Sequence, residues 1–301
     1  MKERFCKKIF ISFFFLSAFF YGIENKPFVG IGLGLGSKVT TQVDQNIYRE
    51  SSRCTANGNT YVGTCYGGNS QATYQGDSKN GLKFIFGNET VFDQYHSSGL
   101  RIYGVIEMQE VSLGNRTKYN ENKANNTFQG ECILDGSTCS TNFKTYNMLN
   151  PTTPQASLPS NVLMTTFSIN LDFFANLPVD TFFKMLWPHF PFLKVGIFAG
   201  VGAEFSLLKS NYWINESLVQ QESVLYASGN GLFINLGTNI YLSKHDRIEI
   251  GYKIPYYQMQ QVMWNSLSIN NTPNPWSDQT LRQTFNIKKS PEFHIAYIYY
   301  F

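Results

Sequence analysis

The chain ends in the stretch Phe293-His294-Ile295-Ala296-Tyr297-Ile298-Tyr299-Tyr300-Phe301, and this stretch decides the fold. Successive side chains of a β-strand point to opposite faces, so residues two apart share a face. On a strand, one face would carry Phe293, Ile295, Tyr297, Tyr299 and Phe301. The other face would carry smaller or polar residues such as His294 and Ala296. A terminal strand with one apolar, aromatic-rich face predicts a sheet whose outer surface meets lipid.

The same period-two alternation occurs in seven earlier segments, which predicts eight strands in all. We expect these strands at 27–36, 80–90, 99–112, 161–175, 193–208, 229–242, 247–258 and 285–301. In the first segment, Gly30, Gly32 and Gly34 resemble part of a dinucleotide-binding loop. The pattern has neither the preceding strand nor the following helix that such a loop needs. Glycines at period two instead make room for large side chains inside a narrow barrel.

The connections between these segments alternate between long and short. Long connections cover 37–79, 113–160, 209–228 and 259–284, and short ones cover 91–98, 176–192 and 243–246. Outer-membrane barrels place long loops outside the cell and short turns in the periplasm. The sequence therefore predicts an all-β fold: an eight-stranded antiparallel up-and-down transmembrane β-barrel, located in the bacterial outer membrane.

The composition fits a membrane barrel better than a soluble domain. Charged residues make up 15% of the chain and aromatic residues 16%, whereas typical globular domains are about 25% charged. Beyond the first 25 residues, no segment has the roughly 20 consecutive apolar residues of a spanning helix. Alternating strands keep the mean hydropathy low and still form a lipid-facing surface.

The first residues read as an export signal. A basic start, Met1–Lys8, precedes an apolar core, Ile9–Tyr21, which is short for a membrane span. We expect a signal peptide at 1–22, cut between 18 and 25, followed by the barrel at 23–301. Residues 1–22 hold four basic residues and one acidic residue, so the remaining chain is neutral. The basic character of the whole sequence therefore gives no reason to expect nucleic-acid binding.

Four cysteines remain after this cleavage: Cys54, Cys65, Cys132 and Cys139. An even number of cysteines in an exported chain predicts disulfides, and four allow three connectivities. We expect the two local pairs, Cys54–Cys65 and Cys132–Cys139, each within one long loop. The alternative, a zinc site, is disfavoured because the sequence has no Cys-x-x-Cys and no nearby pair of histidines.

The predicted strand phases place five basic and five acidic side chains inside the barrel. This expected charge network comprises Lys83, Arg101, Lys194, Arg247, Lys253, Glu107, Asp172, Glu204, Glu249 and Glu292. The charges could line an ion pathway or pair with one another in a packed lumen. Eight strands enclose an interior only wide enough for side chains, so we favour the packed lumen.

Barrel enzymes need a nucleophile with a nearby base, or paired carboxylates with a histidine. The chain has four histidines, and His96 and His245 fall in short turns on the periplasmic side. The remaining two, His189 and His294, form no recognisable nucleophile–base set with another residue. The sequence therefore predicts no catalytic residues, no metal ligands and no cofactor.

The alternating aromatic end, the Gly-alternating segment 27–36, the Phe-rich signal and the paired loop cysteines together resemble the paralogous outer-membrane protein families of Helicobacter. The resemblance implies that the terminal strand, through Phe301 and its neighbours, closes the barrel and is read by the barrel-assembly machinery. It also implies contact with outer-membrane lipid and lipopolysaccharide. The sequence lacks the large extracellular domain of the family's big adhesins, so the resemblance does not imply that this chain has their binding activities.

The expected function is that of a surface-exposed protein, structural or adhesin-like, whose disulfide-pinned loops bind a host or environmental ligand. A narrow porin or channel is the alternative, and an outer-membrane lipid-modifying enzyme is less favoured.

Overall fold

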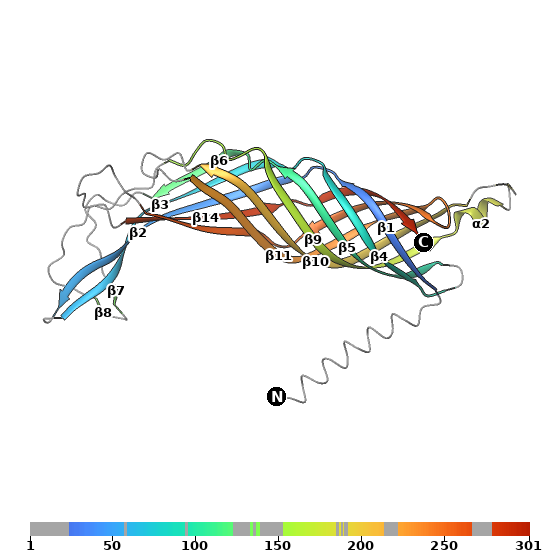
Figure 1. The fold of residues 1–301 in the computed structure, drawn as a ribbon, viewed down its shortest axis with the longest axis horizontal. Helices are drawn as coiled ribbons and strands as arrows, with labels where there is room; N and C mark the ends of the chain where they lie inside the picture. The colour runs from blue at the N-terminus through green and yellow to red at the C-terminus, as the bar shows by residue number, and fades with distance from the viewer. Residues whose placement is uncertain are drawn as a thin grey trace, which may run out of the picture.

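The computed structural model describes residues 24–56, 59–93, 96–122, 133–134, 137–138, 153–184, 187, 189, 192–213, 222–266 and 279–301. The predicted signal peptide at 1–22 lies outside this part of the chain. Among the described residues, no helix combines the length and apolarity needed to cross a membrane. The molecule is elongated and built almost entirely of strands that run along its length (Figure 1).

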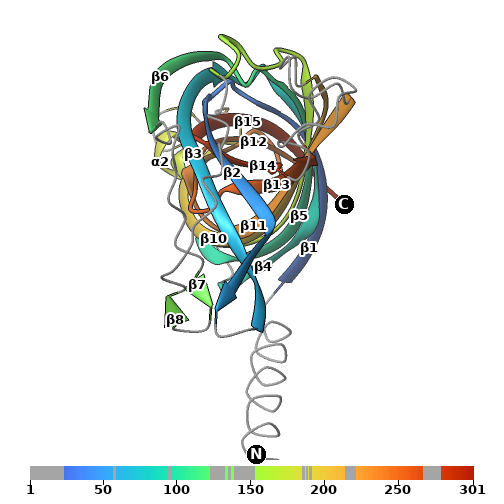
Figure 2. The same ribbon diagram turned by 90° about the vertical axis from the view of Figure 1, so that its left-hand side faces the viewer.

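Eight strands close into an antiparallel barrel, which confirms the predicted fold. They are β1 (Glu24–Gly34), β4 (Gly81–Val91), β5 (Ser98–Val111), β9 (Val162–Leu177), β10 (Lys194–Trp213), β11 (Glu222–Tyr241), β12 (Asp246–Pro255) and β15 (Glu292–Tyr300). Their order is β10-β9-β5-β4-β1-β15-β12-β11, and β11 pairs with β10 to close the ring. The strands form a twisted cylinder when viewed along its axis (Figure 2).

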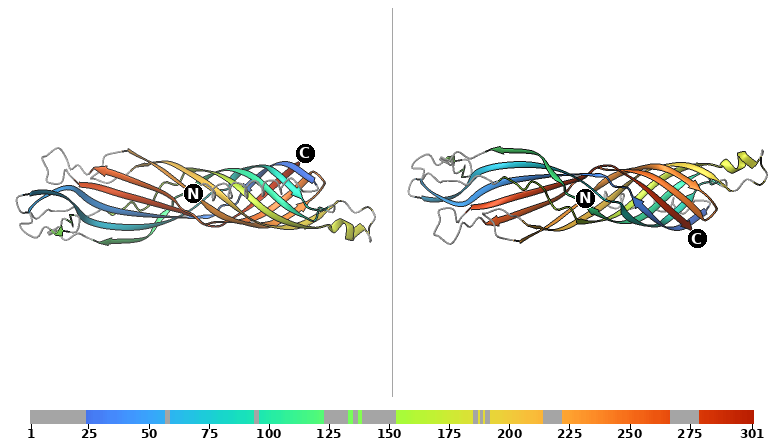
Figure 3. Two further views of the ribbon diagram at one scale, coloured as in Figure 1. Left: turned by 90° about the horizontal axis from the view of Figure 1, so that it is seen from below. Right: turned by 90° about the horizontal axis from the view of Figure 1, so that it is seen from above.

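Five further strands continue this barrel in the direction of the long connections. They are β2 (Lys38–Ala56), β3 (Asn59–Asp77), β6 (Asn115–Asn122), β13 (Met259–Ser266) and β14 (Gln279–Lys289). They form the sheet order β13-β14-β2-β3-β6, which joins β11 through the pairing of Ser228 with Gln260. A short pair, β7 (Ile133–Leu134) and β8 (Ser137–Thr138), and the helix α2 (Val179–Lys184) complete the described elements. Figure 3 shows the extension at the opposite end from α2.

The expectation that 37–79 and 259–284 are loops is therefore wrong. Residues 37–79 consist mainly of β2 and β3, and β13 with part of β14 falls within 259–284. The alternation does continue in β2, where Val39, Val43 and Ile47 are buried. It continues with the opposite phase, because β1 buries even-numbered residues such as Phe28 whereas β2 buries odd-numbered ones.

This change of phase occurs at three neighbouring junctions between consecutive strands, all at the same height along the barrel axis. It lies at Leu35–Ser37 between β1 and β2, at Lys79–Asn80 between β3 and β4, and at Ser290–Pro291 between β14 and β15. The hydrogen bonds Leu35 N→Phe293 O and Ser290 N→Lys38 O hold these breaks side by side. One extra residue in a strand turns every later side chain to the other face.

The two sections of the barrel have opposite polarity. In the ring of eight strands, outward residues are apolar, as at Ile169 (69% exposed), Ile197 and Leu232, and inward residues are charged. In the extension, β2 turns Asp44 outward, where Gln71 of β3 and Asn286 of β14 donate hydrogen bonds to it. We call the first part the membrane section, since lipid requires the apolar face outside. We call the second part the extracellular section, after the expectation that the long connections of an outer-membrane barrel lie outside the cell.

A lysine scan of the outer wall tests this assignment. Ile169→Lys places a charge in the middle of the lipid-facing wall and should destabilise the barrel by ~2–4 kcal/mol. Gln75→Lys, on the exposed face of β3, should change stability by less than ~0.5 kcal/mol. Both are measured by urea unfolding of the protein in lipid vesicles. Equal effects at the two positions would contradict the division into two sections.

The closing strand β15 pairs with β1 on one side and β12 on the other. Its outward face carries Phe293, Ile295, Tyr297, Tyr299 and Phe301, all exposed. Tyr299 packs edge-on against Phe301, with ring centroids 5.6 Å apart. The end of the chain thus lies at the same end of the barrel as the start of β1 (Figure 1).

The structure does not support the expected Cys54–Cys65 disulfide. In the β2–β3 register, Cys54 lies opposite Tyr61 and Cys65 lies opposite Arg49. Bridged cysteines need Cα atoms about 4.4–6.8 Å apart, and positions five residues out of register along a strand are roughly 16 Å apart. Cys132 and Cys139 lie outside the described residues.

Candidate functional site

The interior of the membrane section holds two charged clusters, and the first lies toward the chain termini. Arg101 and Arg247 are the basic members of this arginine cluster, and both are almost completely buried. Arg101 Nη1 lies 2.7 Å from Glu249 and its Nη2 lies 3.5 Å from Asp172. Arg247 Nη1 lies 2.8 Å from Glu89 and its Nη2 lies 3.3 Å from Glu249. Glu249 therefore joins the two guanidinium groups.

Aromatic side chains fill the space around the arginine cluster. Tyr103 donates a hydrogen bond to Asp172 at 2.8 Å, and Tyr300 donates one to Glu89 at 2.6 Å. The Arg101 guanidinium lies over the Phe198 ring, 4.6 Å from its centroid. A guanidinium suits this setting because it stacks on rings and bonds carboxylates at the same time.

The second cluster consists of three lysines and three glutamates. Lys83 and Lys289 lie 2.9 Å and 2.5 Å from Glu292. Lys253 contacts Glu204, and all three ammonium groups lie within 3.8 Å of Glu107. The charges of this lysine cluster balance, and each of its six side chains is at most 9% exposed.

His294 lies between the two clusters. Its Nε2 lies 3.4 Å from Glu249 of the arginine cluster. Its ring also fills the space beside Gly251, where a Cβ atom would come within 2.2 Å of the imidazole. A cavity of about 20 Å³ next to it is lined by residues of both clusters, including Glu249 of the arginine cluster and Lys253 of the lysine cluster. A space of this size holds about one water molecule.

An apolar core fills the extracellular section above the lysine cluster. Its members include Val43, Tyr74, Leu208, Met259 and Phe285, which come from both walls of the section. Each of these five is at most 2% exposed. Along its axis, the barrel is thus occupied first by paired charges and then by packed apolar side chains.

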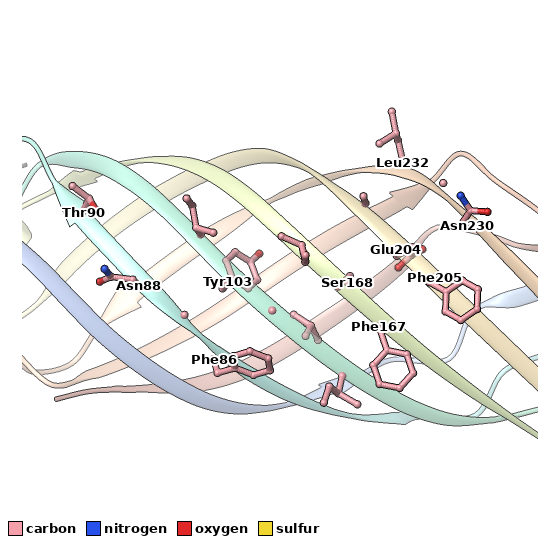
Figure 4. A pocket seen from close by; sticks show the side chains of 18 of the residues that line it. Phe86, Asn88, Thr90, Tyr103, Phe167, Ser168, Glu204, Phe205, Asn230 and Leu232 are labelled. Carbon is pink, nitrogen blue, oxygen red and sulfur yellow. The ribbon is translucent and has the colours of Figure 1, made fainter. Parts of the chain in front are cut away.

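The outer wall of the membrane section carries a shallow groove of about 1160 Å³. Figure 4 shows Phe86, Phe167, Phe205 and Leu232 along this groove, on strands β4, β9, β10 and β11. The small residue Gly104 of β5 lies beside the Phe86 ring. The lining of the groove also includes Tyr103 and Glu204, whose side chains take part in the interior networks.

Comparison with known sequence families decides the identity of the chain. The family described as Helicobacter outer membrane protein matches residues 83–301. The chain belongs to this family. The chain resides in the bacterial outer membrane, as the sequence predicted. A search among curated proteins gives no significant match.

Solved structures similar to this Helicobacter outer membrane protein are also bacterial outer-membrane proteins. OprG from Pseudomonas aeruginosa is 11% identical, with 90% of this chain and 96% of that chain covered and a TM-score of 0.34. The outer membrane protease OmpT from Escherichia coli is 7% identical, with coverages of 92% and 97% and a TM-score of 0.35. Neisserial surface protein A is 11% identical, with coverages of 87% and 97% and a TM-score of 0.27.

Nine of the ten side chains expected in the charge network lie buried in the lumen of this Helicobacter outer membrane protein. Lys194, at the start of β10, differs and lies half-buried at the end of the barrel near the termini. The expected network lacked Glu89, Lys289 and His294, which are buried within it. Among the described residues, no group of three His, Cys, Asp or Glu side chains has the arrangement of a metal site.

Proposed function

We propose that this protein is a non-conducting surface protein that binds a ligand above the membrane. The ligand would bind at the tips of the extracellular section, which are the turn between β2 and β3 and the connections after β6, β10 and β13. The observation that carries the proposal is the extracellular section with its own apolar core. An apolar interior with a polar outside is the arrangement of a water-exposed β-structure, and a membrane-embedded barrel has the reverse. The section therefore serves as a rigid support outside the lipid.

The extracellular section is long enough to carry its tips well away from the membrane. β2 and β3 have 19 residues each, which corresponds to roughly 60 Å of strand at about 3.3 Å per residue. The connections after β6, β10 and β13 start from the same end of the molecule. A host or environmental ligand would meet these tips first, which supports an adhesin-like role.

An epitope-insertion experiment tests the orientation. A peptide epitope placed between Ala56 and Asn59, at the tip of the β2–β3 hairpin, should be detected by antibody on intact cells. The same epitope placed at Lys244, in the turn between β11 and β12, should be detected only after the outer membrane is permeabilised. Detection of the Lys244 epitope on intact cells would invert the orientation and remove the basis of the proposal.

A narrow channel is the second candidate function, because charged side chains do line the membrane section. The pairing of these charges and the apolar core above them leave no continuous polar route along the described interior. We expect the refolded protein to show negligible conductance in planar bilayers. An open porin refolded by the same procedure serves as the positive control. Reproducible single-channel steps from the pure protein would favour the channel instead.

A further inference from the structure

A second, separate cavity opens where the barrel meets the periplasm. Its volume is about 260 Å³, and its lining comes from the start of β1, the β4–β5 turn, the end of β9, the start of β10 and the β11–β12 turn. This size is at the small end for ligand pockets, which hold drug-sized molecules at about 300–1,000 Å³. The cavity therefore suits a small ligand or a single chemical group.

The lining of this periplasmic cavity is basic. It contains three lysines, Lys26, Lys194 and Lys244, and two carboxylates, Glu24 and Glu89. Glu89 already accepts contacts from Arg247 and Tyr300 of the arginine cluster. Glu24 in turn lies 3.6 Å from Lys26. Three lysines against two carboxylates leave the lining with a net positive charge, which favours an anionic ligand.

His96 positions one of these lysines. Lys26 Nζ lies 3.1 Å from His96 Nδ1, and His96 Nε2 lies 3.1 Å from a Glu24 carboxylate oxygen. In this arrangement Nδ1 accepts a hydrogen bond and Nε2 donates one, so the imidazole is neutral. Burial and the neighbouring Lys26 lower the pKa of His96 below its usual value of 6.5, which agrees with the neutral form at pH 7.

The backbone at His96 is held in an uncommon conformation. Its φ is 55°, in the left-handed region that non-glycine residues adopt in only a few per cent of cases. The Asp93 carboxylate fixes the turn by accepting hydrogen bonds from the backbone N–H groups of Ser97 and Ser98. Strained conformations of this kind cluster at functional sites.

Asn176 also lines the cavity and ties the end of β9 to the His96 turn. Asn176 is 5% exposed and donates from Nδ2 to the His96 carbonyl oxygen. Its Oδ1 has no hydrogen-bond partner within the described part of the chain. This oxygen packs against Gly196 of β10, where a Cβ atom would come within 2.0 Å of it, and as an acceptor it adds no contact to an anion.

We propose that the periplasmic cavity binds a compact oxyanion, a carboxylate or phosphate group, with Lys26, Lys194 and Lys244 as its ligands. The proposal concerns the end of the barrel opposite the ligand-binding tips and does not depend on them. The anion can come from a phospholipid headgroup of the inner leaflet or from a soluble or cell-wall molecule. Lysine suits either source, because its ammonium group is a point charge with rotatable donors.

The first test uses the full mature chain refolded in phosphatidylcholine vesicles and titrated with inorganic sulfate by calorimetry. We expect saturable binding with a Kd in the millimolar range or tighter, which corresponds to about −4 kcal/mol or more. The combined Lys26→Gln and Lys194→Gln variant should bind at least about tenfold more weakly, since two charge-assisted contacts are lost.

The matched control variant combines Lys118→Gln with Lys288→Gln, two exposed lysines of the extracellular section. It should bind sulfate as the unmodified protein does. Heat-modifiable mobility on gels shows that each variant is folded. Absence of saturable binding, or equal binding by the cavity variant and the control, would overturn the proposal.

A competition experiment identifies the source of the anion. If the ligand is a lipid headgroup, phosphatidylglycerol in the vesicles should weaken sulfate binding, and acetate should have less effect. If it is a soluble carboxylate, acetate should compete, and phosphatidylglycerol should not. Sulfate binding that neither competitor weakens would contradict an oxyanion site.

The pH dependence supplies a signature for His96. Because its folded pKa is lowered, His96 becomes charged only as the pH falls below its usual range, and sulfate remains doubly charged there. The charged groups around the imidazole are Glu24 and Lys26 of β1, Asp93 of the turn and Lys194 of β10. Sulfate affinity should therefore rise on acidification from pH 7, and His96→Gln should abolish that rise. An unchanged rise in the variant would remove His96 from the site.

Discussion

Replacement of Arg101 by alanine should destabilise the barrel by about 3–5 kcal/mol, the usual cost of removing one partner of a buried ion pair. The variant leaves the buried Asp172 without its arginine partner and leaves Glu249 paired with Arg247 alone. The space that opens next to Phe198 also loses a stacking contact. Urea unfolding in lipid vesicles measures the change.

Two further variants show whether this loss comes from the charge pairing. Adding Asp172→Asn to Arg101→Ala should recover part of the stability, because Asp172 is the carboxylate that loses its basic partner, whereas Glu249 keeps its pairing with Arg247. Lys209→Ala, at an exposed position of β10, should cost less than ~0.5 kcal/mol. If Arg101→Ala were as mild as Lys209→Ala, the paired-charge account of the lumen would be wrong.

Deletion of Phe301 should reduce the amount of folded protein in the outer membrane to a small fraction of the normal level. Phe301 is 69% exposed at the end of β15, and its backbone N–H donates to the Pro27 carbonyl oxygen. Losing one exposed ring at the membrane edge costs little folding energy, since even a charge at mid-depth costs only ~2–4 kcal/mol. A large loss would therefore reflect failed recognition by the assembly machinery.

The conservative variant Phe301→Tyr is the matched control and should assemble normally. Quantification of heat-modifiable barrel in purified outer membranes gives the result. Refolding of the deletion variant from urea into vesicles, without the assembly machinery, should succeed. Normal outer-membrane levels of the deletion variant would show that Phe301 is not part of the signal.

The sequence predicted the membrane section well, because there the apolar alternation and the lipid-facing surface coincide. The predicted strand at 161–175 corresponds to β9 at Val162–Leu177, and that at 99–112 to β5 at Ser98–Val111. The extracellular section was missed because its strands carry polar residues outward and modest apolar residues inward. The inward face of β2, with Val39, Thr41 and Val43, is only moderately apolar. A search for strongly apolar, lipid-facing alternation therefore does not distinguish this segment from a loop.

The same change of phase explains why Lys289 was missing from the predicted charge network. A single alternation through 285–301 puts Lys289 on the same face as Phe293, toward lipid, whereas the break at Ser290–Pro291 turns it inward. Glu89 lies near the end of β4, where the strand phase alone gives it the same face as Lys83. The partners of each charge could not be predicted, because Arg101 and Glu249 are 148 residues apart and meet only across the closed barrel.

The break between the two sections also fixes how deeply the barrel can sit in the membrane. Movement toward the periplasm by a few residues would bring the outward Lys38, Thr40 and Gln42 of β2 into the acyl chains. Movement in the other direction would lift exposed apolar side chains such as Leu163 into water. Each shift is opposed by several side chains at once, so the barrel has a single vertical position. A bilayer whose thickness differs from the height of the membrane section would then have to stretch or thin around the protein.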